Sequence, residues 1–98
     1  MIYYVDIDNT ICTTIGSDYE SSKPISHRID KINRLYSLGH HIVYWTARGS
    51  RSGKDYKLLT EQQLDNWGCL RHSLLMNKPS YDLLIDDKSV DLEYFFDD

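Results

Sequence analysis

Residues 2–10 read Ile-Tyr-Tyr-Val-Asp-Ile-Asp-Asn-Thr, an apolar run that ends in two carboxylates one residue apart. This run predicts a strand over residues 2–8, in which Asp6 and Asp8 share one face and Ile7 lies buried on the other. Two like charges held this close repel each other unless a cation offsets them. Because Mg²⁺ takes oxygen ligands and keeps positions for water and substrate phosphate, the run predicts a metal or catalytic site.

The composition predicts one soluble domain over residues 1–98. No apolar run approaches the ~20 residues of a membrane span, and the chain begins in a strand without the features of a secretory signal, so we expect a cytoplasmic protein without membrane contact. A formal net charge of −4 argues against non-specific nucleic-acid binding, which needs Lys and Arg to neutralise phosphates. Cys12 and Cys69 lack metal-type spacing and are expected to be reduced thiols.

A strand, a helix and a second strand follow one another in the first half of the chain. Apolar residues recur at helical spacing over residues 24–38, where Pro24 suits the helix entry and Gly39 suits the position after its end. Residues 41–46 are rich in β-branched and aromatic residues and follow without a hairpin turn. A strand–helix–strand crossover of this kind produces parallel strands.

The second half of the chain continues the alternation of strands and helices. Polar stretches predict loops before the first helix and after the second strand. The expected elements are loops over residues 9–23 and 47–53, helices over 54–67 and 89–96, and strands over 73–76 and 82–86. The order βαβαββ predicts an open, mostly parallel α/β sheet, whose ligands bind beyond the carboxyl ends of the strands.

Polar side chains follow each predicted strand, and the first of them suit phosphoryl transfer. A carboxylate can attack phosphorus to form an aspartyl phosphate, and Asp6 suits that role of nucleophile. A second carboxyl on the same face, Asp8, can protonate the leaving oxygen and later activate water. The first strand therefore carries both catalytic carboxyl groups.

The other strand ends supply charge for the transferring phosphoryl group and for a metal ion. The hydroxyl of Thr46, the backbone N–H of Ala47 and the ammonium of Lys78 can bind phosphoryl oxygens. Asp86, supported by Asp87, offers a further carboxylate for Mg²⁺. The expected cofactor is therefore Mg²⁺, and the expected partner is a phosphorylated substrate.

Four segments together resemble the four motifs of the haloacid dehalogenase (HAD) superfamily, in the order of that family. They are residues 6–10 (Asp-Ile-Asp-Asn-Thr), 46–48 (Thr-Ala-Arg), 78–79 (Lys-Pro) and 85–87 (Ile-Asp-Asp). The resemblance implies a three-layer, Rossmann-like sheet with flanking helices and Mg²⁺-dependent phosphatase chemistry. Because the first motif holds its second aspartate, the resemblance disfavours cleavage of a carbon–halogen bond.

The resemblance also implies a role for each matched residue. Asp6 is the nucleophile and a metal ligand, Asp8 is the general acid/base with its backbone carbonyl on the metal, and Asp86 is a direct metal ligand. Asn9 stands where many members of the family have Gly. Supporting positions around the ligands are Asp87, Asn9 and Thr10.

The chain leaves no room for the cap domain that many HAD enzymes insert. Residues 10–24 hold one loop, and residues 46–78 hold one helix and one strand. The resemblance is therefore to the capless class, in which the substrate is large, such as a phosphoprotein or a nucleic-acid end, or a partner subunit covers the open site. Small capless HAD proteins of bacterial polysaccharide or sugar-phosphate metabolism are also similar, and a homo-oligomer is one way to cover the site.

A basic loop follows Thr46 and is a candidate for contacts with the remote part of an anionic substrate. It carries Arg48, Arg51 and Lys54, of which Arg48, next to Ala47, is the predicted substrate-binding side chain. The alternative is that this loop is solvated and binds nothing. Tyr19 in the first loop is a further candidate for substrate contact.

Two other functions use similar residues. A signalling receiver module also combines carboxylates, Thr, Lys and Mg²⁺ at parallel strand ends, but its phosphorylated Asp lies on a middle strand, where this chain has Thr46. The second is a HAD relic that binds a metal or a partner without catalysis. The intact Asp6 and Asp8 argue against this alternative.

Overall fold

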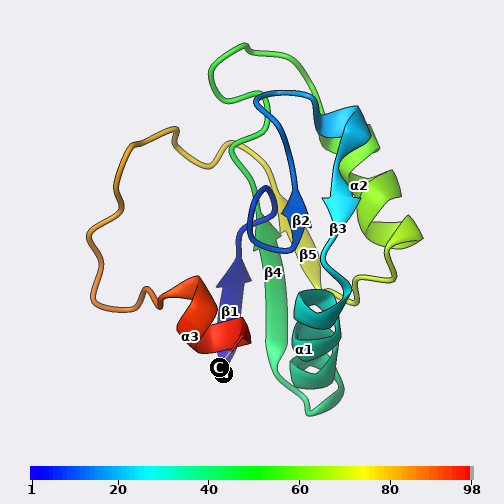
Figure 1. Ribbon diagram of the computed structural model, residues 1–98, viewed down its shortest axis with the longest axis vertical. Coiled ribbons are helices and arrows are strands. Elements are labelled where there is room, and N and C mark those ends of the chain that lie inside the picture. Colours follow the sequence, from blue (N-terminus) through cyan, green and yellow to red (C-terminus); the bar gives the residue numbers. More distant parts are fainter. Residues whose placement is uncertain (98) are drawn as a thin grey trace.

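A three-stranded parallel sheet forms the centre of the computed structural model, which describes residues 1–97 (Figure 1). The strand order is β1 (Ile2–Val5), β4 (His41–Trp45) and β5 (Ser73–Leu75), so the first strand lies at one edge. The register pairs Val5 with Tyr44 and Tyr44 with Leu74. With three helices and a radius of gyration of 13.0 Å, the chain is a small, compact α/β protein, in agreement with a Rossmann-like fold.

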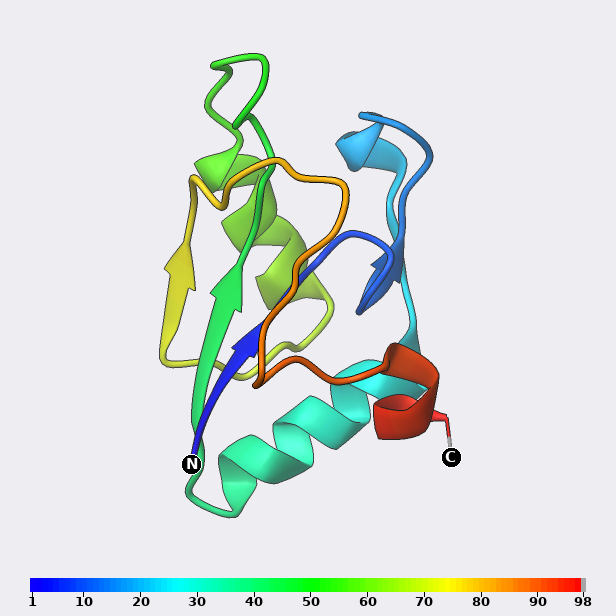
Figure 2. The same cartoon turned by 90° about the vertical axis from the view of Figure 1, so that its left-hand side faces the viewer.

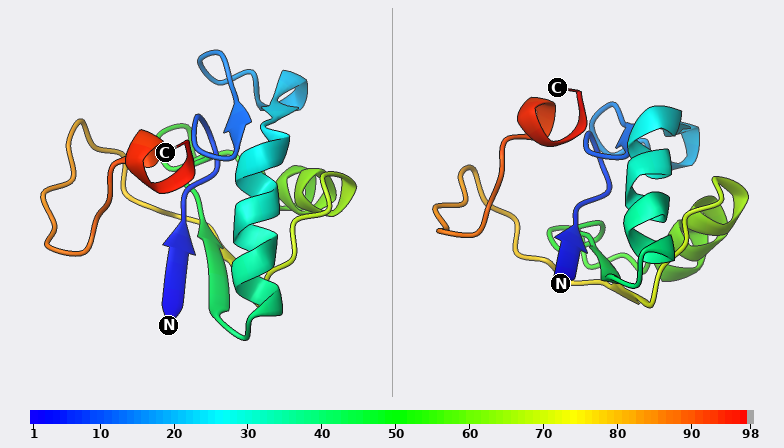
Figure 3. Two further views of the ribbon diagram at one scale, coloured as in Figure 1. Left: turned by 60° about the horizontal axis from the view of Figure 1, so that its bottom comes forward. Right: turned by 90° about the horizontal axis from the view of Figure 1, so that it is seen from below.

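All three helices pack on one face of this sheet: α1 (Ser26–Ser37), α2 (Lys57–Asn66) and α3 (Leu92–Phe96), as the right-hand view of Figure 3 shows. Alternation places Val5, Ile42 and Tyr44 on the covered face, because the parallel partners of a sheet share a face. There they form one buried cluster with Ile29 and Ile32 of α1 and Leu64 of α2.

The expected three-layer arrangement is therefore wrong for the described part of the chain, which has two layers. The second face of the sheet carries no described helix. Ile2, Tyr4 and Leu75, whose side chains alternate onto this face, are exposed. In the described chain, helices cover only one face of the sheet.

The predicted loop over residues 9–23 contains a small hairpin (Figure 2). Its antiparallel strands are β2 (Cys12–Thr13) and β3 (Lys23–Pro24), and a short 3-10 helix, η1 (Tyr19–Ser21), lies between them. Pro24 belongs to β3, so α1 begins two residues later than predicted. This hairpin, with η1, is called the flap below.

A tight turn joins β1 to the flap and shortens the first strand, which ends at Val5 and not at Asp8. The backbone N–H groups of Thr10 and Ile11 both donate to the carbonyl of Ile7. Asn9 has φ 60°, a left-handed conformation that Asn adopts more readily than most residues. The turn directs Asp6 and Asp8 away from the strand, while Ile7 and Ile11 are fully buried.

Two other predicted elements begin later than expected. The second helix starts at Lys57 and not at residue 54, because residues 54–56 still belong to the loop that follows β4. The last helix starts at Leu92, where the side chain of Asp91 accepts a hydrogen bond from the backbone N–H of Tyr94. An Asp cap of this kind satisfies a free N–H group of the first turn.

The predicted strand over residues 82–86 is wrong. Figures 1 and 2 show that the chain leaves β5, swings outward away from β1 and descends toward α3 without joining the sheet. Among the described residues, no backbone hydrogen bond links residues 79–90 to the sheet. Leu83 and Ile85 are 77% and 90% exposed. The apolar run is present, but in this chain it has no neighbouring strand.

No helix in the described range has both the length and the apolar character needed to cross a membrane.

The buried face of α2 gives a direct test of this packing. Leu64→Ala should lower the free energy of unfolding by about 3 kcal/mol, because it removes a fully buried side chain and leaves a cavity. Leu58→Ala, on the exposed side of the same helix, should change it by less than about 0.5 kcal/mol. Chemical denaturation measures both, and equal effects would contradict the assignment of the buried face.

Candidate functional site

A cavity of about 580 Å³ lies at the carboxyl ends of the strands. The floor carries Asp6 and Asp8, and the walls come from the flap, from the loop between β4 and α2, and from the residues after β5. Three cationic residues of the loop line it, Arg48, Arg51 and Lys54, and Lys78 lines it from the segment after β5. Residues of the first three motifs therefore meet at one cavity, which holds both carboxylates and several cations.

Asp6 is the most accessible carboxylate of this floor. Its Oδ2 accepts a hydrogen bond of 2.9 Å from the hydroxyl of Thr10, which fixes the orientation of the carboxylate. Its Oδ1 lies 3.5 Å from Nζ of Lys78. The side chain of Asp6 is 37% exposed, so one carboxylate edge faces the cavity while Thr10 holds the other.

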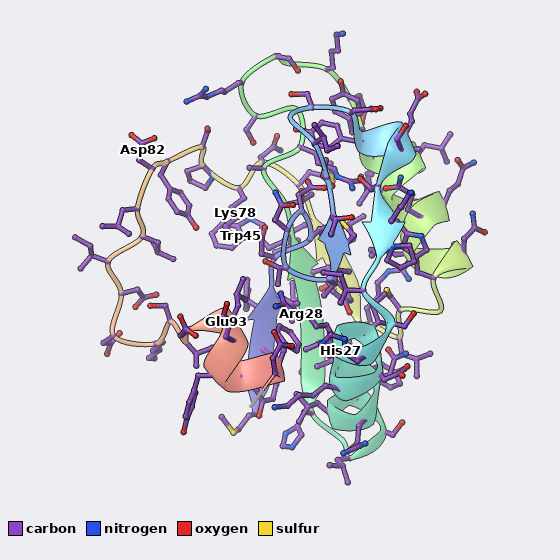
Figure 4. The ribbon with its side chains drawn as sticks, in the orientation of Figure 1. His27, Arg28, Trp45, Lys78, Asp82 and Glu93 are labelled. Atoms are coloured by element: carbon purple, nitrogen blue, oxygen red, sulfur yellow. The ribbon has the colours of Figure 1, made fainter. Side chains whose placement is uncertain are left out.

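Lys78 is held beside Asp6 by its backbone and by its side chain. Its backbone N–H donates to the carbonyl of Thr46 at 3.0 Å, and its own carbonyl accepts from the hydroxyl of Ser50 at 2.7 Å. The ammonium lies 5.6 Å from the centre of the Trp45 ring, and Figure 4 shows the two side chains together near the end of β1. A cation–π contact of this kind keeps the lysine in place while it retains its charge.

Asp8 makes a forked ion pair with Arg48. Nη2 of Arg48 donates to Oδ1 at 2.8 Å, and Nε donates to Oδ2 at 3.0 Å. The hydroxyl of Thr14 donates to the same Oδ1 at 2.6 Å. The end of the first strand is thereby tied to the loop after β4 and to the flap, and both oxygens of Asp8 accept hydrogen bonds.

Arg48 itself is buried, with 2% of its surface exposed. Nη1 donates to the hydroxyl of Thr60 at 3.2 Å and to the side-chain oxygen of Gln63 on α2. Its guanidinium lies 4.8 Å from the ring centre of Tyr19 in the flap. Its donors are thus engaged within the protein, and from this position Arg48 orients Asp8. Arg48 still lines the cavity, so its contact with substrate stays a prediction, while Arg51 and Lys54 are the exposed cations of the loop.

The loop after β4 owes its path to Gly49. This residue has φ +81°, and a Cβ placed there would lie 2.1 Å from the carbonyl oxygen of Lys54. Only glycine allows the loop to fold back so closely. The close approach holds Arg51 and Lys54 at the rim of the cavity.

Of the predicted supporting residues, Thr10 donates to Asp6, and Asn9 directly follows Asp8 in the turn. The side chain of Asn9 accepts a hydrogen bond of 3.1 Å from the backbone N–H of Thr14. It therefore places the hydroxyl of Thr14 against Asp8. Burial raises the pKa of the neighbouring Cys12 thiol, which favours its neutral form.

Thr46 and Ala47 take different positions. Ala47 lines the cavity, as a residue that offers its backbone N–H to a phosphate should. Thr46 is 1% exposed, and its hydroxyl accepts a hydrogen bond of 3.2 Å from the backbone N–H of Arg48. In this arrangement Thr46 shapes the loop and does not line the cavity.

Asp86 and Asp87 are not brought to the cavity. Both are exposed on the outer segment, and the nearest partner of the Asp86 carboxylate is the backbone N–H of Lys88 at 3.2 Å. This hydrogen bond lowers the pKa of Asp86. The predicted metal ligand therefore lies apart from Asp6 and Asp8 in a single chain.

The predicted Mg²⁺ ligands are only partly brought together in one chain. Within the described range, no group of three or more His, Cys, Asp or Glu side chains converges on a point. Asp8 is paired with Arg48, and Asp6 has Lys78 beside it. Two carboxylates with water and substrate phosphate suit Mg²⁺, so Asp6 and Asp8 are the residues of this chain that would hold it, while Asp86 does not lie beside them.

Sequence reasoning missed the residues that hold the Asp8–Arg48 pair: Thr14, Thr60 and Gln63. Thr60 and Gln63 are both buried on α2, where they take positions that a regular apolar stripe would give to hydrophobic residues. The irregular apolar pattern of this helix was the available signal, because a polar residue on a buried helix face needs a partner.

Comparisons with known proteins give the fold and no activity. No known family profile matches the chain, and no curated protein does. A crystal structure of a structural-genomics target from Vibrio cholerae matches with a TM-score of 0.87 and 26% identity, over 96% of this chain and 85% of that one. Its description names no function. The α/β architecture is therefore shared with an experimentally determined protein.

The Asp8–Arg48 pair should be a strong determinant of stability. Arg48→Met should lower the free energy of unfolding by about 3 kcal/mol, because it strands Asp8 and leaves two polar groups of α2 without a donor. Arg51→Met, at an exposed position of the same loop, should change it by less than about 0.5 kcal/mol. Urea denaturation measures the free energy of unfolding of both variants. An Arg48→Met variant as stable as the wild type would contradict the claim that the Asp8–Arg48 pair stabilises the fold.

Proposed function

We propose that the protein is a phosphomonoester hydrolase of the HAD-like type, with Asp6 as its covalent nucleophile. The observation that carries this proposal is the ammonium of Lys78, 3.5 Å from the Asp6 carboxylate, in a cavity that Arg51 and Lys54 also line. Cations around an accessible carboxylate favour an anionic substrate, because they offset the charge of its phosphoryl oxygens. The order of the four motifs supports the same reaction.

The first half-reaction transfers the phosphoryl group to the enzyme. One carboxylate oxygen of Asp6 forms a bond to phosphorus while the ester P–O bond breaks, and its electron pair leaves with the substrate oxygen. The carboxyl of Asp8, which shares the cavity floor, supplies the proton that this oxygen takes up. Lys78 stabilises the charge on the phosphoryl oxygens.

The second half-reaction releases phosphate. Water attacks the phosphorus of the aspartyl phosphate and gives one proton to Asp8, and the bond between phosphorus and Asp6 breaks. Inorganic phosphate leaves, and Asp6 is again a carboxylate and Asp8 a carboxyl group. In the resting arrangement Asp8 is a carboxylate paired with Arg48, so we expect it to turn partly from Arg48 and to take up a proton from solvent when substrate binds, before it acts as the acid.

Mg²⁺ is the cofactor in this proposal, as the HAD resemblance implies. When bound, it would offset the charge between the carboxylates and the phosphoryl oxygens. Asp6 is the residue of this chain that is most open to such an ion, and the predicted third ligand, Asp86, does not lie beside it in one chain.

The cavity supports a class of substrates and not one compound. The rim cations Arg51 and Lys54 lie on a loop that faces solvent, and the described fold has no cap over them. An open, cationic rim suits a phosphate carried on a sugar or on the end of a larger molecule.

Asp6→Asn should reduce Mg²⁺-dependent phosphate release at least about a thousandfold, because the amide cannot act as the nucleophile. Asp18→Asn, an exposed carboxylate of the flap, is the matched control and should keep wild-type rates. The assay is a panel of phosphorylated sugars, nucleotides, nucleic-acid ends and phosphopeptides. The proposal fails if no member of the panel is hydrolysed, or if Asp6→Asn is as active as the wild type.

Lys54→Met should raise KM about fivefold with little change in kcat, because a rim cation binds the remote charge of the substrate equally in the ground state and the transition state. Lys57→Met, on the exposed start of α2, serves as the control. Steady-state kinetics separates the two constants. A fall in kcat without a change in KM would place Lys54 at the reacting phosphoryl group instead.

A further inference from the structure

We infer that residues 82–86 of a second copy of the chain add to the free edge of β1 and bring the Asp86 of that copy to Asp6 and Asp8. The metal-binding part of this inference rests on the proposed function, whereas the exchange of strands between copies does not. The inference follows from an open sheet edge, an exposed apolar segment and the short chain length between Lys78 and Asp86.

The free edge belongs to β1, which pairs with β4 on one side and, in the described structure, with nothing on the other. Its outer N–H and C=O groups therefore lack backbone partners. An open edge of this kind is a template for pairing with another strand. The edge ends at Asp6, so a strand added there reaches the cavity.

The segment that suits this edge is exposed along its whole length. Leu83, Leu84 and Ile85 stand in a row between two acidic ends, and Leu83 and Ile85 are 77% and 90% exposed. An apolar run exposed to this degree marks an interaction surface. A short continuous apolar run is also typical of a parallel strand that is buried on both faces.

The segment cannot bring Asp86 to the site of its own chain as a parallel strand. Asp86 would then lie beside Asp6 and Asp82 beside Ile2, roughly 13 Å lower along the strand. Lys78 is fixed at the end of β4, two strand spacings or about 10 Å from a strand added beyond β1. The height of roughly 13 Å and this sideways distance combine to a straight-line gap of roughly 16 Å between Lys78 and Asp82. Four extended residues span at most about 14 Å.

The observed path of residues 79–91 runs antiparallel to β1. Residues 79–91 run from Lys78, at the carboxyl end of the sheet, down to α3, where Phe95 contacts Tyr3 with 6.4 Å between ring centres. Figures 1 and 2 show the segment descending while β1 rises, and Figure 4 places Asp82 far out on the upper part of this path. Docking within one chain would be antiparallel and would bring Asp82, not Asp86, to the cavity.

A two-fold axis perpendicular to β1 reverses this direction. The segment of one copy then runs parallel to β1 of the other, and the exchange is reciprocal, as in an isologous dimer. With Asp86 beside Asp6, Leu83 and Ile85 join the helix-covered face next to Tyr3 and Val5. Leu84 joins Tyr4 on the other face, and Asp86 points to the same side as Asp6. The partner's Asp86 would then supply a third carboxylate for the Mg²⁺ of the proposed function.

The oligomeric state tests the exchange without any assay of activity. Analytical ultracentrifugation of the wild type at micromolar concentration should give a dimer. Ile85→Asp should give a monomer, while Ile15→Asp, an equally exposed isoleucine in the loop between β2 and η1, should stay dimeric. A monomeric wild type, or a dimer that Ile85→Asp leaves intact, overturns the inference.

Cross-linking tests the register and the direction. Chains with Ile2→Cys mixed with chains with Asp82→Cys should be joined by a short bis-maleimide, because the parallel exchange places these positions side by side. The double variant Ile2→Cys/Asp86→Cys is the control for antiparallel docking within one chain. Cross-linking inside that double variant, without cross-linking between the first two chains, overturns the inference.

Complementation tests whether Asp86 acts in the partner's site. Asp6→Asn and Asp86→Asn should each be inactive as homodimers, but co-expression should restore about a quarter of wild-type activity, because half of the dimers are mixed and each has one intact site. If the wild type is active but co-expression restores no activity, the partner does not supply Asp86 to the site. An inactive wild type refutes the proposed function, and the dimer and cross-linking results then decide the exchange alone.

Discussion

The ion pair between Asp8 and Arg48 is the interaction on which the site depends. It joins the end of β1 to the loop after β4, and through Thr14, Thr60 and Gln63 it extends to the flap and α2. A buried guanidinium is tolerated only when its donors are paired, so each of these elements is fixed relative to the others. The cavity exists because this pair holds its walls together while Asp6, one residue before the turn, stays open.

The sequence patterns predicted the parallel sheet and the crossover helix well, because Val5, Ile29 and Tyr44 lie in periodic apolar patterns that burial alone dictates. They also predicted that Asp6 and Lys78 meet, since both follow parallel strands. The burial of Arg48 was not predictable in this way. A charged residue in a glycine-containing loop is normally expected to be exposed. The burial of Arg48 is favourable only because Thr60 and Gln63 on α2 accept its hydrogen bonds, and these contacts are not visible in the sequence.

Residues 82–86 show a second limit of such patterns. An apolar run indicates that a segment needs burial, but it does not identify the edge or the molecule that provides it. In the described chain the run lies outside the sheet, and Leu83 and Ile85 remain exposed. The third carboxylate of the predicted set is thus separated from the first two by the path of the backbone and not by its chemistry. A second copy would resolve both problems with one strand.

The central claim is that Asp6 forms a covalent bond to phosphorus, and the most direct measurement is the identification of the phosphorylated residue. Acid quenching during turnover, followed by proteolysis and mass spectrometry, should find one phosphoryl group on the peptide that contains Asp6, and on no other acidic peptide. The label should be absent from Asp6→Asn. A phosphoryl group on Asp8 or Asp86, or turnover without any labelled carboxylate, would contradict the account.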